Sequence, residues 1–164
     1  GLVGVTPAAG FVTPLGALLI GAITAFVCFF AVSFKVKLGI DDALDTYPVH
    51  GVGGTVGAIL AGVFATKLVN SAGANGLLFG ETGQLFQGND PMQLVKQIEA
   101  VVIAYVIAGV GTFLILKLLE ATVGLRVKPE AEYQGMDITE HGEEGYGEEF
   151  AAGLSPVGDR PAHG

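Results

Sequence analysis

The chain has 164 residues, of which 51% are hydrophobic and only 15% are charged, and 26 are glycine. This composition is wrong for a soluble domain of this size and typical of a membrane protein, whose helices often approach each other at small residues. Residues 1–128 hold seven acids and seven bases, so the net charge of −8 falls entirely on residues 129–164, with nine acids and one base. We therefore expect a neutral membrane part joined to an acidic tail, with no basic patch for nucleic acid.

The first 34 residues hold no formal charge. Residues 1–10 are too short to span a bilayer and too apolar to be a free loop, so we expect them to be the end of a preceding transmembrane helix. Thr13-Pro14 suits the start of a helix, because proline is tolerated in a first turn. The apolar run that follows can cross about 30 Å of hydrocarbon, which predicts a transmembrane helix over about 13–34.

A second uncharged run covers residues 46–66, which is 21 residues, and three carboxylates precede it: Asp41, Asp42 and Asp45. Carboxylates are favoured at a helix N-terminus by the free N–H groups and by the helix dipole. We predict a helix over about 44–66 with Asp45 as its cap.

A long polar connection over residues 67–96 follows, with short strands or turns. The third predicted helix covers about 97–124 and includes 17 uncharged residues between Glu99 and Lys117. The sequence thus predicts an all-α membrane protein with three transmembrane helices and a tail.

The basic residues predict the orientation of these helices. Four of them fall on the side of the first loop and the tail, and two on the side of the long loop 67–96. The positive-inside rule then makes the long loop extracytoplasmic and the tail, 129–150, cytoplasmic. We expect residues 151–164 to be disordered.

His50 is the one histidine in the second uncharged run. It could be a structural residue satisfied by a carbonyl or hydroxyl group, but an ionisable group within a membrane favours a functional role. A neutral imidazole offers one donor and one acceptor, which suits a small polar solute. Asp45 lies five residues away, which is the wrong helical spacing for an ion pair with His50.

Other chemistry has less support. No second metal ligand stands at a suitable spacing from His50, and no nucleophile or second catalytic group accompanies it. We therefore expect no metal, no cofactor and no enzyme activity. Cys28 lies alone in an apolar run and reads as a small buried or lipid-facing residue.

The second predicted helix carries small residues at helical spacing. This pattern indicates close helix–helix packing without direct contact to a substrate. The first line of small residues is Gly53, Gly57 and Ala61, and the second is Gly54, Ala58 and Gly62.

Residues 41–54 read Asp-Asp-Ala-Leu-Asp-Thr-Tyr-Pro-Val-His-Gly-Val-Gly-Gly. This segment closely resembles the part of ammonium transporters that carries the second of two pore histidines. Residues 1–10 resemble the end of the preceding helix of that family. Residues 122–127 and 135–146 resemble its last helix and its cytoplasmic tail. The resemblance runs in the right order along nearly the whole chain.

The resemblance implies the last three helices and the tail of an eleven-helix subunit in a homotrimer, located in the plasma or inner membrane. Each subunit of that family moves ammonium or ammonia through a narrow hydrophobic pore, with methylammonium as an analogue. His50 matches the second pore histidine, Asp45 an acidic residue on its cytoplasmic side, and Thr46 and Val49 would lie near the pore. The first histidine belongs to an earlier helix, so this chain alone cannot form that pore.

The resemblance also implies a regulatory tail that contacts neighbouring subunits and, in many bacteria, a PII-type signalling protein. Thr139 aligns with a position phosphorylated in plant relatives. From the sequence alone, Thr139 could equally be a residue of a turn. The alternative is a membrane-anchored regulatory module whose acidic tail binds a signalling protein. The tail residues concerned are Gly135, Asp137, Thr139, His141, Gly142 and Tyr146.

Overall fold

The computed structural model describes residues 1–143 and 145, and the elements of that part of the chain are helical. Three of these segments are long and apolar enough to cross a membrane: Pro14–Leu38, Tyr47–Phe64 and Met92–Thr122. The prediction of an all-α membrane protein with three candidate spans is therefore confirmed. The chain divides into two compact units, with the boundary in the sequence between residues 110 and 111.

The first long helix, α2, covers Pro14–Leu38. The Thr13 hydroxyl caps it by accepting a backbone N–H of the first turn at 3.2 Å. Gly39, with φ 65°, ends the helix in the left-handed conformation that glycine adopts without strain. The helix extends four residues beyond the predicted end at residue 34. Lys35 and Lys37 therefore lie in its last turn, where the helix dipole favours cations.

The second span combines two kinds of helix. It starts as the π-helix η2, Tyr47–Val52, and continues as α3, Gly53–Phe64. It begins three residues later and ends two residues earlier than the predicted range of 44–66. Short π-helical turns often occur at functional sites, because the wider turn changes which side chains share a face. His50 lies within this π-helical turn.

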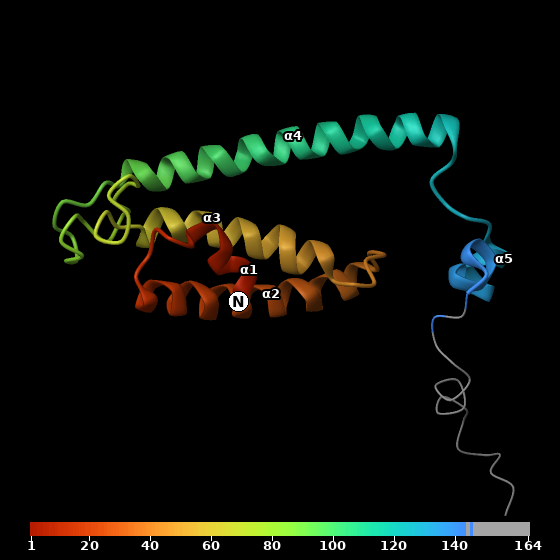
Figure 1. Cartoon of the computed structure of the whole chain (residues 1–164), viewed down its shortest axis with the longest axis horizontal. Coiled ribbons are helices and arrows are strands. Elements are labelled where there is room, and N and C mark those ends of the chain that lie inside the picture. The colour runs from red at the N-terminus through yellow and green to blue at the C-terminus, as the bar shows by residue number, and fades with distance from the viewer. Residues whose placement is uncertain (144, 146–164) are drawn as a thin grey trace, which may run out of the picture. The chain divides into compact units, whose positions relative to one another are not determined.

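Two short elements precede these spans: α1 covers Leu2–Val5, and the 3-10 helix η1 covers Thr6–Ala8. α2 and α3 run antiparallel and side by side, with α1 against both of them (Figure 1). The apolar core lies at the start of α2 and the end of α3, away from η2. Its buried members are Ala8, Val12, Ile20, Ala61 and Phe64.

Glycines allow α1, α2 and α3 to approach this closely. Gly53 and Gly57 are buried, and a Cβ added at Gly57 would lie 2.1 Å from the carbonyl oxygen of Gly4. The interpretation of the first line of small residues as a packing face is confirmed. The members of the second line differ in how closely they pack. A Cβ added at Gly54 has no neighbour within 4 Å, whereas one added at Gly62 would lie 3.0 Å from the backbone of Leu94.

The connection after α3 is an ordered loop rather than a loose one. Its backbone N–H groups at residues 76–78 donate to carbonyl groups at the end of α3, at 2.8–3.0 Å. A helix end leaves such carbonyls without intrahelical partners, so the loop satisfies them. The Asn75 amide binds two more backbone groups, and a short antiparallel bridge joins Phe79 to Leu85.

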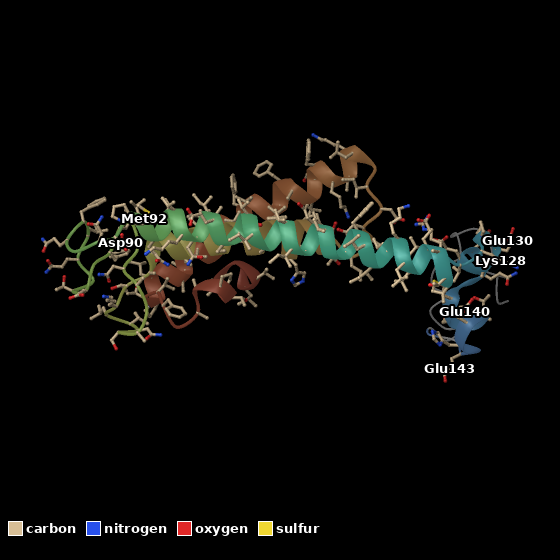
Figure 2. All side chains as sticks on the ribbon, turned by 90° about the horizontal axis from the view of Figure 1, so that it is seen from above. Asp90, Met92, Lys128, Glu130, Glu140 and Glu143 are labelled. Carbon is tan, nitrogen blue, oxygen red and sulfur yellow. The ribbon has the colours of Figure 1, made fainter. Side chains whose placement is uncertain are left out.

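The third span, α4, covers Met92–Thr122 and begins five residues before the predicted start at 97. Asp90 lies two residues before this start (Figure 2). Its carboxylate accepts the Met92 N–H at 3.0 Å. The predicted range placed Lys96 in the surface loop, whereas the structure includes it in the first turns of the helix. The apolar side chains of α4 are largely exposed in the described chain, as expected for a helix that faces lipid or other helices.

The second unit contains two short helical turns beyond α4. These are α5, Pro129–Gln134, and the π-helix η3, Asp137–His141. Charged side chains, including Lys128, Glu130, Glu140 and Glu143, surround them (Figure 2). The acidic tail is therefore partly structured up to residue 143. The residues expected to be disordered, 151–164, lie outside the described part of the chain.

Candidate functional site

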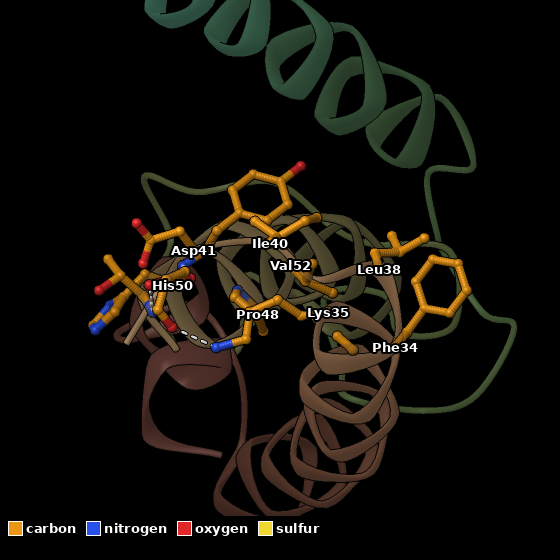
Figure 3. A pocket seen from close by; sticks show the side chains of 13 residues that line it. Phe34, Lys35, Leu38, Ile40, Asp41, Pro48, His50 and Val52 are labelled. Carbon is orange, nitrogen blue, oxygen red and sulfur yellow. Dashed lines mark hydrogen bonds between the residues drawn. The ribbon is translucent and has the colours of Figure 1, made fainter. Parts of the chain in front are cut away.

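A pocket of about 640 Å³ lies where the end of α2, the loop after it and η2 meet (Figure 3). Its walls are mostly apolar, with a few polar groups among them, which is the usual character of a small-molecule site. The lining residues include Phe34, Lys35, Ile40, Asp42, Pro48 and His50.

The structure brings two of the predicted site residues, Thr46 and His50, to this pocket. His50 is exposed, and within the described residues its imidazole has no hydrogen-bond partner, so both ring nitrogens are available to a ligand or to another part of the protein. Asp45, Val49 and Gly53 do not line the pocket.

Val49 and Gly53 contact α2 instead of the pocket. The carbonyl oxygen of Val49 lies 3.9 Å from the Cys28 sulfur, and a Cβ added at Gly53 would lie 3.0 Å from that same sulfur. Cys28 is buried, in agreement with its interpretation as a small packing residue. These residues hold η2 and the start of α3 against α2, and His50 lies in the same turn, at the pocket.

The prediction that Asp45 caps the second span is wrong, because Asp42 is the cap. The two carboxylate oxygens of Asp42 accept the N–H groups of Thr46 and Tyr47, each at 2.9 Å. The Tyr47 N–H contributes most to holding the pKa of Asp42 below its ordinary value. Burial opposes it, and the Thr46 N–H and the charge of Lys35 lower the pKa further. Asp45 instead forms an ion pair with Lys35.

The hydroxyl groups of Thr55 and Tyr105 hold the part of the chain that directly follows His50. The Thr55 hydroxyl donates to the carbonyl oxygen of Gly51 at 2.7 Å and lies 2.7 Å from the hydroxyl of Tyr105. The Tyr105 hydroxyl is also 3.4 Å from Gly51 O. The sequence reasoning missed Tyr105, although a tyrosine inside the apolar run of residues 100–116 is a signal for a hydrogen bond from its hydroxyl group to a neighbouring segment.

The predicted tail residues cluster around Asp137. Its carboxylate accepts the N–H groups of Gly145 and Ile138, which hold its pKa below the ordinary value. Gly142, with φ 65°, ends η3 in the left-handed conformation. The Thr139 side chain is exposed and donates to the Gly135 carbonyl at 2.9 Å. Tyr146 lies outside the described residues.

The family model described as Ammonium Transporter Family matches residues 1–146 of this chain. The chain belongs to the ammonium transporter family. Family membership places it among transporters rather than enzymes and agrees with the resemblance that the sequence showed. With its three candidate spans, it is a membrane protein.

Individual relatives agree with this assignment. An ammonium transporter of Bacillus subtilis is 47% identical over 147 residues, which is 89% of this chain and 34% of the relative. Ammonium transporter Amt1 of Archaeoglobus fulgidus is 40% identical over 146 residues, again 89% of this chain and 34% of the relative. This chain thus spans about a third of the length of these curated relatives.

A solved structure also matches the fold. The crystal structure of Saccharomyces cerevisiae Mep2 superimposes with a TM-score of 0.64 at 34% sequence identity. The match covers 79% of this chain and 28% of that structure. The three-span arrangement therefore corresponds to part of the Mep2 fold.

Proposed function

We propose that this chain forms the last three transmembrane helices and the tail of an ammonium channel or transporter, with His50 on the conduction path. The observation that carries this proposal is the site of His50, on a π-helical turn of a charge-free span, open to a pocket of about 640 Å³. Family membership supports ammonium or ammonia as the transported solute. His50 would be one of two pore histidines, and the other would come from an earlier helix.

The imidazole suits this role chemically. It accepts or donates one hydrogen bond in its neutral form and exchanges protons near neutral pH. The apolar walls of the pocket disfavour a hydrated ion, so a solute must give up water contacts and bind to the few polar groups. Helices from an earlier part of the transporter would complete the pore, and the family resemblance favours a homotrimer in a plasma or inner membrane.

Replacement of His50 tests this role. In the intact transporter reconstituted into liposomes, we expect His50→Ala to change methylammonium uptake by about tenfold or more, or to alter the selectivity against potassium. The reason is loss of the polar group in an apolar passage. Assembly should remain that of the unmodified protein, since the side chain is exposed in this structure. Liposomes without protein give the background. Unchanged uptake and selectivity in an assembled variant would contradict conduction past His50.

The tail is proposed to be the cytoplasmic regulatory region, with a PII-type signalling protein as its partner. The organised turn around Asp137 and the exposed Thr139 side chain support a surface that another protein recognises. The second candidate function, a membrane-anchored regulatory module, relies on the same features but gives the spans no role in conduction.

Removal of the tail separates regulation from conduction. Deletion of the residues after Arg126 should weaken PII binding and change how uptake responds to it, while the protein still folds and assembles. Uptake and PII binding by the deleted protein are measured beside those of the intact transporter. Complete loss of assembly would instead assign the tail a structural role.

A further inference from the structure

Lys35 lies in the last turn of α2 and reaches into the loop before η2. Its ammonium group donates to the Asp42 carbonyl oxygen and to the Asp45 carboxylate. The Lys35 side chain is only 12% exposed. Lys37 lies in the same turn, but it is exposed and has no partner among the residues that the structure describes. The two lysines are therefore not equivalent ends of a transmembrane span.

The loop that Lys35 holds has an unfavourable backbone conformation. Asp45 has a φ of 53°, in the left-handed region that residues with a Cβ rarely adopt. The Asp45 N–H donates to the Asp42 carbonyl at 3.2 Å, and Lys35 donates to that same carbonyl. One ammonium group thus binds both ends of the turn, at the Asp42 carbonyl and at the Asp45 carboxylate.

This turn leads directly to His50. The Asp45 carbonyl accepts the Val49 N–H at 3.0 Å, which connects the turn to η2 one residue before His50. Figure 3 shows Lys35 extending past Pro48 toward the segment that carries His50, on the side away from Phe34. Lys35 also lines the pocket that His50 opens to. A continuous set of contacts therefore runs from α2 through Lys35 and Asp45 to Val49, the residue before His50.

We infer that Lys35 is a positioning residue that sets the orientation of His50 through its ion pair with Asp45. This inference rests on the proposed function, in which His50 lies on the conduction path. Lys35 itself need not touch the transported solute. Its pairing with Asp45 also offsets the charge of that carboxylate, which lies close to the pocket.

A double-mutant cycle tests this inference, with initial methylammonium uptake by the intact transporter in liposomes as the readout. We expect Lys35→Met and Asp45→Asn each to lower the maximal rate about fivefold or more while the KM changes less than twofold. The two changes together should cost no more than either one alone. Asparagine tolerates the left-handed conformation, so Asp45→Asn removes the ion pair without disturbing the backbone. If the Lys35→Met variant fails to assemble, Asp45→Asn still shows whether loss of the ion pair lowers the maximal rate.

The cycle with His50 separates positioning from a general structural role. In the His50→Ala background, Lys35→Met should have no further effect on rate or selectivity, because the group that it positions is absent. Lys37→Met is the matched control and should behave as the unmodified protein. Equal, additive losses from Lys35→Met with and without His50 would overturn the inference and leave the proposed function standing. No effect of His50→Ala by itself would overturn both.

Discussion

Replacement of Gly57 by alanine should destabilise the membrane part strongly. The added Cβ would lie 2.1 Å from the Gly4 carbonyl oxygen and 2.7 Å from its carbon, far inside van der Waals contact. These are backbone atoms of another helix, so α1 and α3 must move apart. Overpacking of this kind typically costs about 1–3 kcal/mol. We expect the intact transporter in detergent to lose its native size-exclusion peak at a temperature several degrees lower than the unmodified protein.

Gly54 provides the matched control on the same helix. An added Cβ at Gly54 has no neighbour within 4 Å in the described chain. Alanine is the better helix former by roughly 1 kcal/mol, so Gly54→Ala should leave the melting temperature unchanged or raise it. An equal loss of stability in both variants would show that helix contacts outside the described chain, rather than the α1–α3 approach, determine the effect.

Replacement of Asp42 by alanine should release the start of η2. The variant loses both acceptors for the Thr46 and Tyr47 N–H groups, which then have no partner at the beginning of a helix. We expect a lower melting temperature and a loss of uptake, since His50 lies on the released segment. Asp42→Asn should lose less, because one oxygen can still accept a backbone N–H. An Asp42→Ala variant with normal stability and uptake would contradict the capping role.

The pH dependence gives an independent check on Asp42. Its pKa in the folded protein is below the ordinary value, so the charged carboxylate stabilises the folded state above the pKa of the unfolded chain. That stabilisation is lost as the pH falls through the lower, folded-state pKa, in the range below about pH 4. The difference in melting temperature between the unmodified protein and Asp42→Ala should therefore shrink as the pH falls below 4. A difference that stays constant over pH 3–7 would exclude the charge as its cause.

Hydropathy predicted the three spans well because the lipid environment acts on each segment separately. A run such as residues 100–116 must lie in hydrocarbon whatever its neighbours are. The third helix begins five residues before its predicted start at 97, because Lys96 can lie in a helical turn at the membrane surface while its charge remains in water. Local composition therefore identifies a span, but it does not determine the residue at which the helix begins.

The site was predictable only in part. His50 is evident from the cost of an ionisable group in an uncharged span, and Thr46 lies beside it at the pocket. Lys35 and Tyr105 were missed because their partners are distant in the sequence: Lys35 binds residue 45, and Tyr105 binds residue 55. Neither spacing is a helical one, so no pattern in one segment indicates these contacts.

The sequence by itself determined that this is an all-α membrane protein of the ammonium transporter family, with a histidine in an uncharged span and an acidic tail. These properties depend on hydropathy and on a continuous motif, both of which are local. Only the tertiary structure decided that Asp42 rather than Asp45 is the cap, and that Lys35 joins Asp45. The physical reason is the left-handed turn at Asp45, which directs its carboxylate back to α2 and leaves Asp42 facing the first N–H groups of η2.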